Sequence, residues 1–92
     1  MDLWNLGKTE GILEENSICC SSYNTGFFET VKLMGDIIAI YCGHDHKNDF
    51  HGVYEGISLA YGRKTGIGAY GPSLGIPKGA RVIQLYQNDP KR

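Results

Sequence analysis

Residues 37–46 have the sequence Ile37-Ile38-Ala39-Ile40-Tyr41-Cys42-Gly43-His44-Asp45-His46, and this stretch decides the expected fold. Its six apolar residues are rich in β-branched side chains, which is typical of a strand covered on both faces of an α/β sheet. Ligands of such sheets bind at the carboxyl ends of the strands, where the two histidines follow. We therefore expect an α/β fold with a candidate site at residues 43–46.

His44 and His46 are two positions apart, so in extended chain their side chains would point the same way, with Cα atoms roughly 6.5–7 Å apart. Neighbouring ions of a two-metal site are about 3.5–4 Å apart, so each imidazole could reach an ion of its own. Asp45 would point to the other side, where it would support the ligands or the loop. Gly43 would let the backbone turn sharply out of the sheet.

Two other interpretations of these histidines stay open from the residues alone. Histidines at this spacing also occur on surfaces and in cores that bind no metal. A self-contained zinc site would need a third and a fourth ligand. The local candidates are Cys42, Asp49 and His51, but none of them has the spacing of a known short zinc module.

Composition limits the partners that the chain can be expected to bind. The chain has 92 residues, enough for one small domain or part of a larger one, and a formal net charge of −1. This charge gives no reason to expect nucleic-acid or membrane binding. The longest apolar run is too short to cross a bilayer, and the start of the chain does not resemble a signal peptide. Three cysteines make no disulfide framework, and Cys42 is expected to be a buried thiol.

The chain around residues 37–42 predicts one helix and further strands. Phe27, Val31 and Met34 have helical spacing, with Asn24 or Thr25 as the N-cap and Gly35 as the stop. Strands are expected at residues 53–54 and 57–61, joined in a hairpin by Glu55-Gly56, and at residues 80–86. Irregular structure is expected over residues 1–12, a polar loop over 47–52 and a long glycine-rich loop over 62–79, with a brief strand possible at 18–20.

Several motifs together resemble the calcineurin-like metallophosphoesterases, in particular their purple acid phosphatase-like branch. Residues 43–50, Gly-His-Asp-His-Lys-Asn-Asp-Phe, resemble the G-H-D-H-x-N-D-[FY] signature of that branch. Residues 24–29 resemble its N-[ST]-G-F-F segment, residues 61–71 its glycine-rich Y-G-R-x-T-G loop, and residues 79–85 its closing G-A-R-[VI]-[IL]-E-L strand. The resemblance covers nearly the whole chain, from about Leu3 to Leu85.

The resemblance implies a phosphatase for phosphate monoesters that works at two metal ions, iron, zinc or manganese, in an αββα sandwich. His44 would bind one ion and His46 the other, and a hydroxide on the metal would attack phosphorus. Arg63 and Tyr61 are the candidates for contact with the phosphate ester substrate, although a solvated cation and a packing tyrosine are the simpler interpretations.

None of the earlier ligand blocks of the family, D-x-H, G-D-x-x-D and G-N-H-[DE], occurs before Gly43. Residues 1–92 are therefore expected to be the C-terminal segment of the domain, with a mixed sheet and one main helix, whose partner is the missing N-terminal part. Two imidazoles cannot hold two metal ions without carboxylates, so we expect weak metal binding and no turnover by the chain alone. The alternative is a truncated product or interaction module that has no catalytic role and binds no metal.

Overall fold

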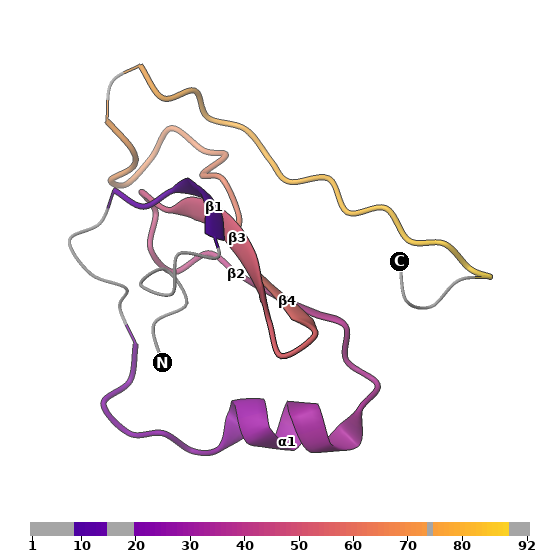
Figure 1. The fold of residues 1–92 in the computed structure, drawn as a ribbon. Helices are drawn as coiled ribbons and strands as arrows, with labels where there is room; N and C mark the ends of the chain where they lie inside the picture. The colour runs from indigo at the N-terminus through magenta and orange to yellow at the C-terminus, as the bar shows by residue number, and fades with distance from the viewer. Residues whose placement is uncertain (1–8, 15–19, 74, 89–92) are drawn as a thin grey trace.

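A four-stranded mixed sheet and one helix form the regular structure of this chain (Figure 1). The structure is a computed structural model that describes residues 9–14, 20–73 and 75–88. The strand order is β1-β3-β4-β2, in which only β2 and β4 run parallel. The predicted α/β class, with a mixed sheet and one main helix, is confirmed. The elements are β1 (Thr9–Ile12), α1 (Phe27–Met34), β2 (Ala39–Cys42), β3 (Asp49–Tyr54) and β4 (Ile57–Tyr61).

The hairpin of β3 and β4 forms the centre of the sheet. Glu55 and Gly56 connect the strands with φ angles of 49° and 82°, the two positive values that a tight hairpin turn requires. The predicted hairpin is thus confirmed, but the polar loop expected over 47–52 is wrong because β3 already begins at Asp49. Along β3 the buried residues Phe50 and Gly52 alternate with the exposed residues His51 and Val53, so the two sets lie on opposite faces of the sheet.

β1 contradicts the irregular structure expected for residues 1–12, as far as those residues are described. It pairs antiparallel with β3, with Gly11 opposite Phe50. A Cβ atom on Gly11 would lie 2.2 Å from the carbonyl oxygen of Asp49, and Gly11 has a φ of 127°. Glycine, which indicated a loop in the sequence, is therefore what lets β1 approach β3. The other early predictions, including most of the brief strand at 18–20, lie outside the described residues.

β2 forms the edge of the sheet next to β4, and its register pairs Ala39 with Ser58. The interpretation of residues 37–42 as a strand covered on both faces is wrong for the described part of the chain. Ile38 is 41% and Tyr41 45% exposed, and Cys42, expected to be a buried thiol, is also exposed. The reason is that no described element packs closely enough over the faces of β2 to bury these side chains.

The helix α1 is confirmed over the predicted residues, but its N-cap differs from the prediction. Gly26 is the N-cap, with no side-chain cap, while Asn24 accepts a hydrogen bond from the Gly26 amide at 2.9 Å. Gly35 ends the helix in the left-handed conformation, as expected. The rings of Phe28 and Tyr54 lie 5.3 Å apart and connect the helix to the end of β3.

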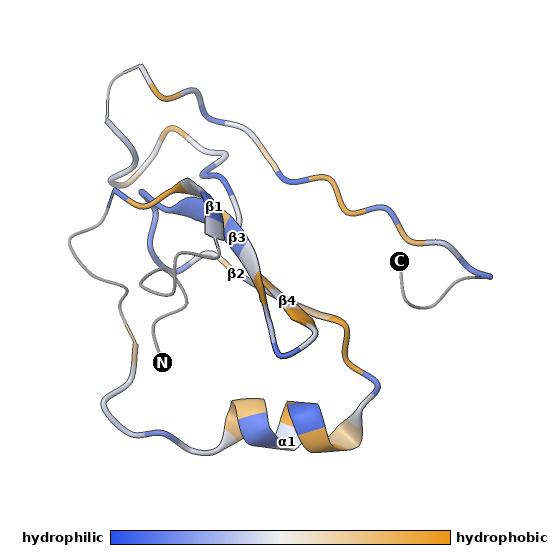
Figure 2. Cartoon of the chain, viewed as in Figure 1, coloured by the Kyte–Doolittle hydropathy of each residue, from blue (hydrophilic) through white to orange (hydrophobic). Residues whose placement is uncertain are grey.

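The C-terminal segment, residues 80–86, was expected to be the last strand, and this prediction is wrong for the structure described. The segment is extended but pairs with no described strand, and it runs away from the sheet (Figure 1). Hydrophobic and hydrophilic residues alternate along it (Figure 2), so the strand pattern is present without a partner. The preceding loop, 62–79, has no helix or strand in its described residues, as predicted. No described helix is long and apolar enough to span a membrane.

Candidate functional site

The histidine loop, residues 43–48, follows β2 at its carboxyl end, where the sequence predicted the site. Residues 44–47 bend and turn, and the Asn48 amide donates a hydrogen bond to the Asp45 carbonyl at 3.2 Å. The expectation that His44 and His46 lie on extended chain is therefore wrong. Their relative placement is set by a turn, so the spacing derived for a strand does not apply.

Asp45 anchors the histidine loop to the interior of the protein. Asp45 is 1% exposed. Its Oδ2 accepts hydrogen bonds from the Tyr61 hydroxyl at 2.8 Å and from the side-chain nitrogen Nδ2 of Asn48 at 3.4 Å. Asn48 in turn accepts a hydrogen bond from the Glu14 backbone at 3.2 Å. Burial and the hydrogen bond to Asp45 raise the pKa of Tyr61, so its proton stays in place. Asp45 thus supports the loop, as expected.

The two histidines have different surroundings. His46 stacks on Tyr70, with ring centroids 4.3 Å apart and ring planes 14° from parallel. The Nδ1 atom of His46 lies 3.0 Å from the Tyr70 carbonyl oxygen. His44 is exposed. His46 is therefore held by the glycine-rich loop, a contact that the sequence analysis did not foresee.

Arg63 lines a pocket beside His46, but its guanidinium also has protein partners. The pocket has a volume of about 280 Å³, and Gly43, Gly62, Lys64 and Thr65 complete its wall. Arg63 donates to Oδ2 of Asp49 at 2.7 Å from Nε and from Nη2, and to the Pro77 carbonyl at 2.6 Å. The structure thus brings Arg63 and His46 to one pocket, while His44 and Tyr61 are not among its lining residues.

The described residues do not by themselves form a metal site. Among them, no group of three or more histidine, cysteine or acidic side chains is arranged to hold a metal ion. Asp45 is buried against Tyr61, and Asp49 is paired with Arg63 and Arg81. Two imidazoles fit the role of ligands, but this donor set lacks the carboxylates that ions of charge +2 or +3 require. Although Cys42 is exposed, the loss of water around its sulfur, which contacts the Ala60 carbonyl, raises the pKa of the thiol and disfavours the thiolate that binds metal.

Comparison with known proteins shows which family these features belong to. The chain is 38% identical over 84 residues to a protein of Arabidopsis thaliana named "Probable inactive purple acid phosphatase 29". The aligned residues make up 91% of this chain and 21% of that protein. It is 33% identical over 72 residues to "Probable inactive purple acid phosphatase 14" (78% and 18%) and 39% over 57 residues to "Probable inactive purple acid phosphatase 28" (62% and 14%), both of the same plant. The matches lie in the C-terminal part of these proteins.

The chain is thus related to calcineurin-like metallophosphoesterases, and it belongs to their purple acid phosphatase-like family. This confirms the resemblance found in the motifs. The chain spans about a fifth of the length of the first of these relatives and less of the other two. No protein-family model matches it, and no solved structure shows significant similarity.

Proposed function

We propose that the chain supplies His44 and His46 as ligands to the dinuclear metal site of a phosphatase that hydrolyses phosphate monoesters. Residues 1–92 would be one part of the calcineurin-like phosphoesterase domain. The observation that carries this proposal is the placement of His46. It follows the carboxyl end of β2, and its ring is fixed by Tyr70 beside a pocket, in a chain that belongs to this family.

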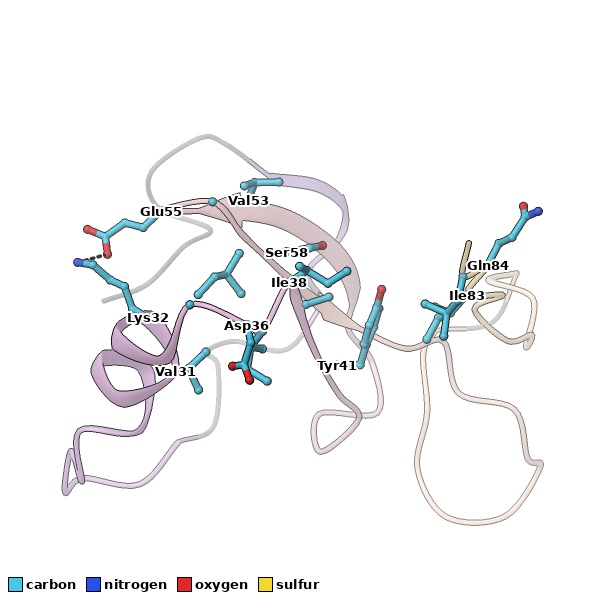
Figure 3. Close-up of a pocket in the computed structure, with 16 residues that line it drawn as sticks. Val31, Lys32, Asp36, Ile38, Tyr41, Val53, Glu55, Ser58, Ile83 and Gln84 are labelled. Carbon is cyan, nitrogen blue, oxygen red and sulfur yellow. Dashed lines mark ion pairs between the residues drawn. The ribbon is translucent and has the colours of Figure 1, made fainter. Parts of the chain in front are cut away.

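The surface of the sheet supports the proposal that more protein covers it. A groove of about 970 Å³ lies between α1, the strands β2 to β4 and the C-terminal segment (Figure 3). Exposed apolar side chains gathered in one groove are typical of surfaces that pack against other protein. β2 also presents an edge to which a further strand could be added. The apolar residues of the groove that are at least 40% exposed are Ile37, Ile38, Tyr41, Val53, Ile83 and Leu85.

The metal ions of the family, iron, zinc or manganese, supply Lewis-acid activation of water and of the phosphoryl group when bound. His44 and His46 would bind one ion each. Asp45 holds the loop that carries them, and Tyr61 contributes through its hydrogen bond to Asp45. Arg63 lines the pocket and is proposed to contact the phosphate ester, with Asp49 and Pro77 fixing the direction of its guanidinium.

A second candidate function is an interaction module without catalysis or metal. The names of the three relatives describe each of them as probably inactive, and the described residues provide no third metal ligand. In that case the groove between α1 and the sheet would be the functional surface, and His46 would serve only to pack the glycine-rich loop.

Metal binding separates the two candidates. In the ¹⁵N-labelled chain, substoichiometric Mn²⁺ should broaden the imidazole signals of His44 and His46 before those of His51, which lies on the exposed face of β3. In His46→Ala the His44 signal should no longer broaden before that of His51, whereas in His51→Ala the signals of His44 and His46 should still broaden at substoichiometric Mn²⁺. Equal broadening of all three imidazoles, or none, would favour the interaction module.

An activity assay tests whether the chain is sufficient. We expect no hydrolysis of p-nitrophenyl phosphate by the purified chain with manganese, zinc or iron, because two imidazoles without carboxylates hold such ions weakly. Metal-dependent turnover that His46→Ala abolishes would show that the chain forms a complete site.

A further inference from the structure

We propose that Tyr70 is a positioning residue for His46. It holds the imidazole of His46 as the tautomer that carries its hydrogen on Nδ1 and its lone pair on Nε2. The use of that lone pair for metal rests on the proposed function. The tautomer itself is a property of the chain without metal, so the two can be tested separately.

The hydrogen-bond partner of Nδ1 determines the tautomer. Nδ1 of His46 lies 3.0 Å from the carbonyl oxygen of Tyr70. A carbonyl oxygen only accepts hydrogen bonds, so in a neutral imidazole the hydrogen must be on Nδ1. Nε2 then carries the lone pair, which is the form in which histidine binds a metal ion. A second partner of this kind is what commonly orients metal-binding histidines.

Ring stacking adds an orientation to this hydrogen bond. The two rings are nearly parallel at 14°, with centroids 4.3 Å apart, so rotation of the imidazole out of its plane would lose the contact. The hydroxyl oxygen of Tyr70 also lies 3.5 Å from the His46 backbone nitrogen. Tyr70 thus contacts the ring face, the Nδ1 edge and the backbone of one histidine.

The loop that carries Tyr70 is itself fixed on both sides of this residue. On the N-terminal side, Arg63 is paired with Asp49. On the C-terminal side, the Pro77 carbonyl accepts from Arg63, and the Gly79 amide donates to the Lys64 carbonyl at 3.1 Å. These contacts close residues 63–79 into a loop with a defined base. The position of Tyr70 therefore does not depend on His46 alone, which is necessary if Tyr70 is to orient the histidine.

The tautomer is measured directly by long-range ¹H–¹⁵N NMR of the ¹⁵N-labelled full chain without metal at pH 8, above the ordinary titration range of histidine. We expect the Nδ1–H form to dominate for His46. Exposed His51, whose Nε2 lies 3.9 Å from a carboxylate oxygen of Glu10, is the internal control and should show the Nε2–H form. If Nε2–H dominates at His46 in the unaltered chain, the proposal is wrong, whatever the metal affinity.

Two variants separate the ring of Tyr70 from its hydroxyl. Tyr70→Phe keeps the stacked ring and should keep the Nδ1–H form. Tyr70→Ala keeps the backbone carbonyl but removes the ring that holds the imidazole against it. The share of the Nδ1–H form at His46 should therefore fall, while the dispersed amide signals of the β3–β4 hairpin show that the fold persists. An unchanged tautomer in Tyr70→Ala would refute the positioning role of the side chain.

Zinc titration then tests the link to metal binding. Tyr70→Ala should weaken zinc binding about 10- to 100-fold, the usual effect of removing a residue that orients a ligand, and Tyr70→Phe should stay within about threefold of the unaltered chain. If the unaltered chain shows the Nδ1–H form but zinc perturbs His46 no more than His51, the proposed function is contradicted and the positioning of His46 stands. Equal zinc affinity in Tyr70→Ala would show that the positioning has no consequence for metal.

Discussion

The Tyr61 hydroxyl donates a hydrogen bond to Oδ2 of Asp45 at 2.8 Å and thereby connects the last residue of β4 to the histidine loop. Asp45 is 1% exposed, so its carboxylate exchanges almost all contact with water for contacts inside the protein. A buried carboxylate is costly unless hydrogen-bond donors surround it. The bond from Tyr61 therefore stabilises both the fold and the shape of the loop.

Replacing Tyr61 with phenylalanine should lower the free energy of unfolding by about 1–3 kcal/mol, because Asp45 then loses one donor while it stays buried. The aromatic ring still packs against Phe50, whose ring centroid lies 5.2 Å away, so the loss isolates the hydroxyl. Urea unfolding followed by circular dichroism measures the difference. Tyr23→Phe is the matched control, since Tyr23 is 75% exposed and should lose almost nothing. Equal stability of both variants would contradict the role assigned to this bond.

Asp49 joins three separate segments through one carboxylate. Its Oδ2 accepts from Arg63 and its Oδ1 from Arg81, at 2.7 and 2.9 Å, and its side chain is 21% exposed. Arg81 also donates to the Tyr61 carbonyl at 3.0 Å. The start of the C-terminal segment is therefore attached to the sheet although the segment is not a strand.

The Asp49→Asn variant should be less stable by about 1.5–3 kcal/mol, because two charged hydrogen bonds lose their anionic acceptor. Amide hydrogen exchange of Gly79 should also become faster, since the loop base next to it is released. Asp36→Asn, at an exposed position after α1, is the control and should change neither quantity. Unaltered exchange at Gly79 would mean that Asp49 does not hold the loop.

Local signals made part of the fold predictable. The helix over 27–34 followed from side-chain spacing and from Gly35, and the hairpin followed from the turn at Glu55-Gly56. Both depend on residues close in sequence. β1 depends instead on pairing with β3, which lies some forty residues later, and its Gly11 resembled a loop residue. The strand pattern of 80–86 was correct as a pattern, but a strand also needs a partner.

In the candidate site, too, features that depend on neighbouring residues were predictable, and contacts between distant residues were not. The sequence located His44 and His46 at the end of a strand, because an apolar run followed by a glycine is a local signal. It did not predict that Tyr70 would stack on His46, or that Arg63 and Arg81 would share Asp49, since each of these pairs is separated by 14 to 32 positions. The motifs at 61–71 and 79–85 contained these residues, but a motif does not state which side chains meet.

The hairpin turn offers a stabilising substitution. Glu55 has a φ of 49°, a conformation that costs energy for most side chains but that asparagine tolerates, and Gly56 already follows it. Glu55→Asn should raise the free energy of unfolding by about 0.5–1 kcal/mol. The variant loses the exposed ion pair with Lys32, which should matter little. Glu55→Gln also changes the ion pair but keeps an unfavourable turn residue, so it should show no gain. Urea unfolding of the unaltered chain and of the two variants measures the free energy of unfolding. A gain in both variants would mean that loss of the ion pair, and not the turn conformation, causes the stabilisation.

Glu14 should give the protein a contact that is lost in acid. Both its carboxylate oxygens accept from the Ser73 amide, at 2.9 and 3.1 Å, and the Ser73 hydroxyl donates to Oε1. These bonds lower the pKa of Glu14 below its ordinary value of 4.5. A lowered pKa means that the ionised form is favoured in the folded state. The contact therefore contributes fully above pH 4.5 and is lost as the pH falls through the lower folded value.

The titration of Glu14 can be followed through its side-chain ¹³C carboxyl signal, which we expect to have a midpoint below pH 4.5. The Ser73 amide should lose protection from exchange over the same range, because protonation removes the anionic acceptor. Glu14→Gln should show weaker protection of Ser73 at neutral pH and no acid transition there. Ser73→Ala, which removes only the hydroxyl, should move the Glu14 midpoint upward. A midpoint at or above 4.5 in the unaltered chain, or one that Ser73→Ala leaves in place, would show that this contact does not form in solution.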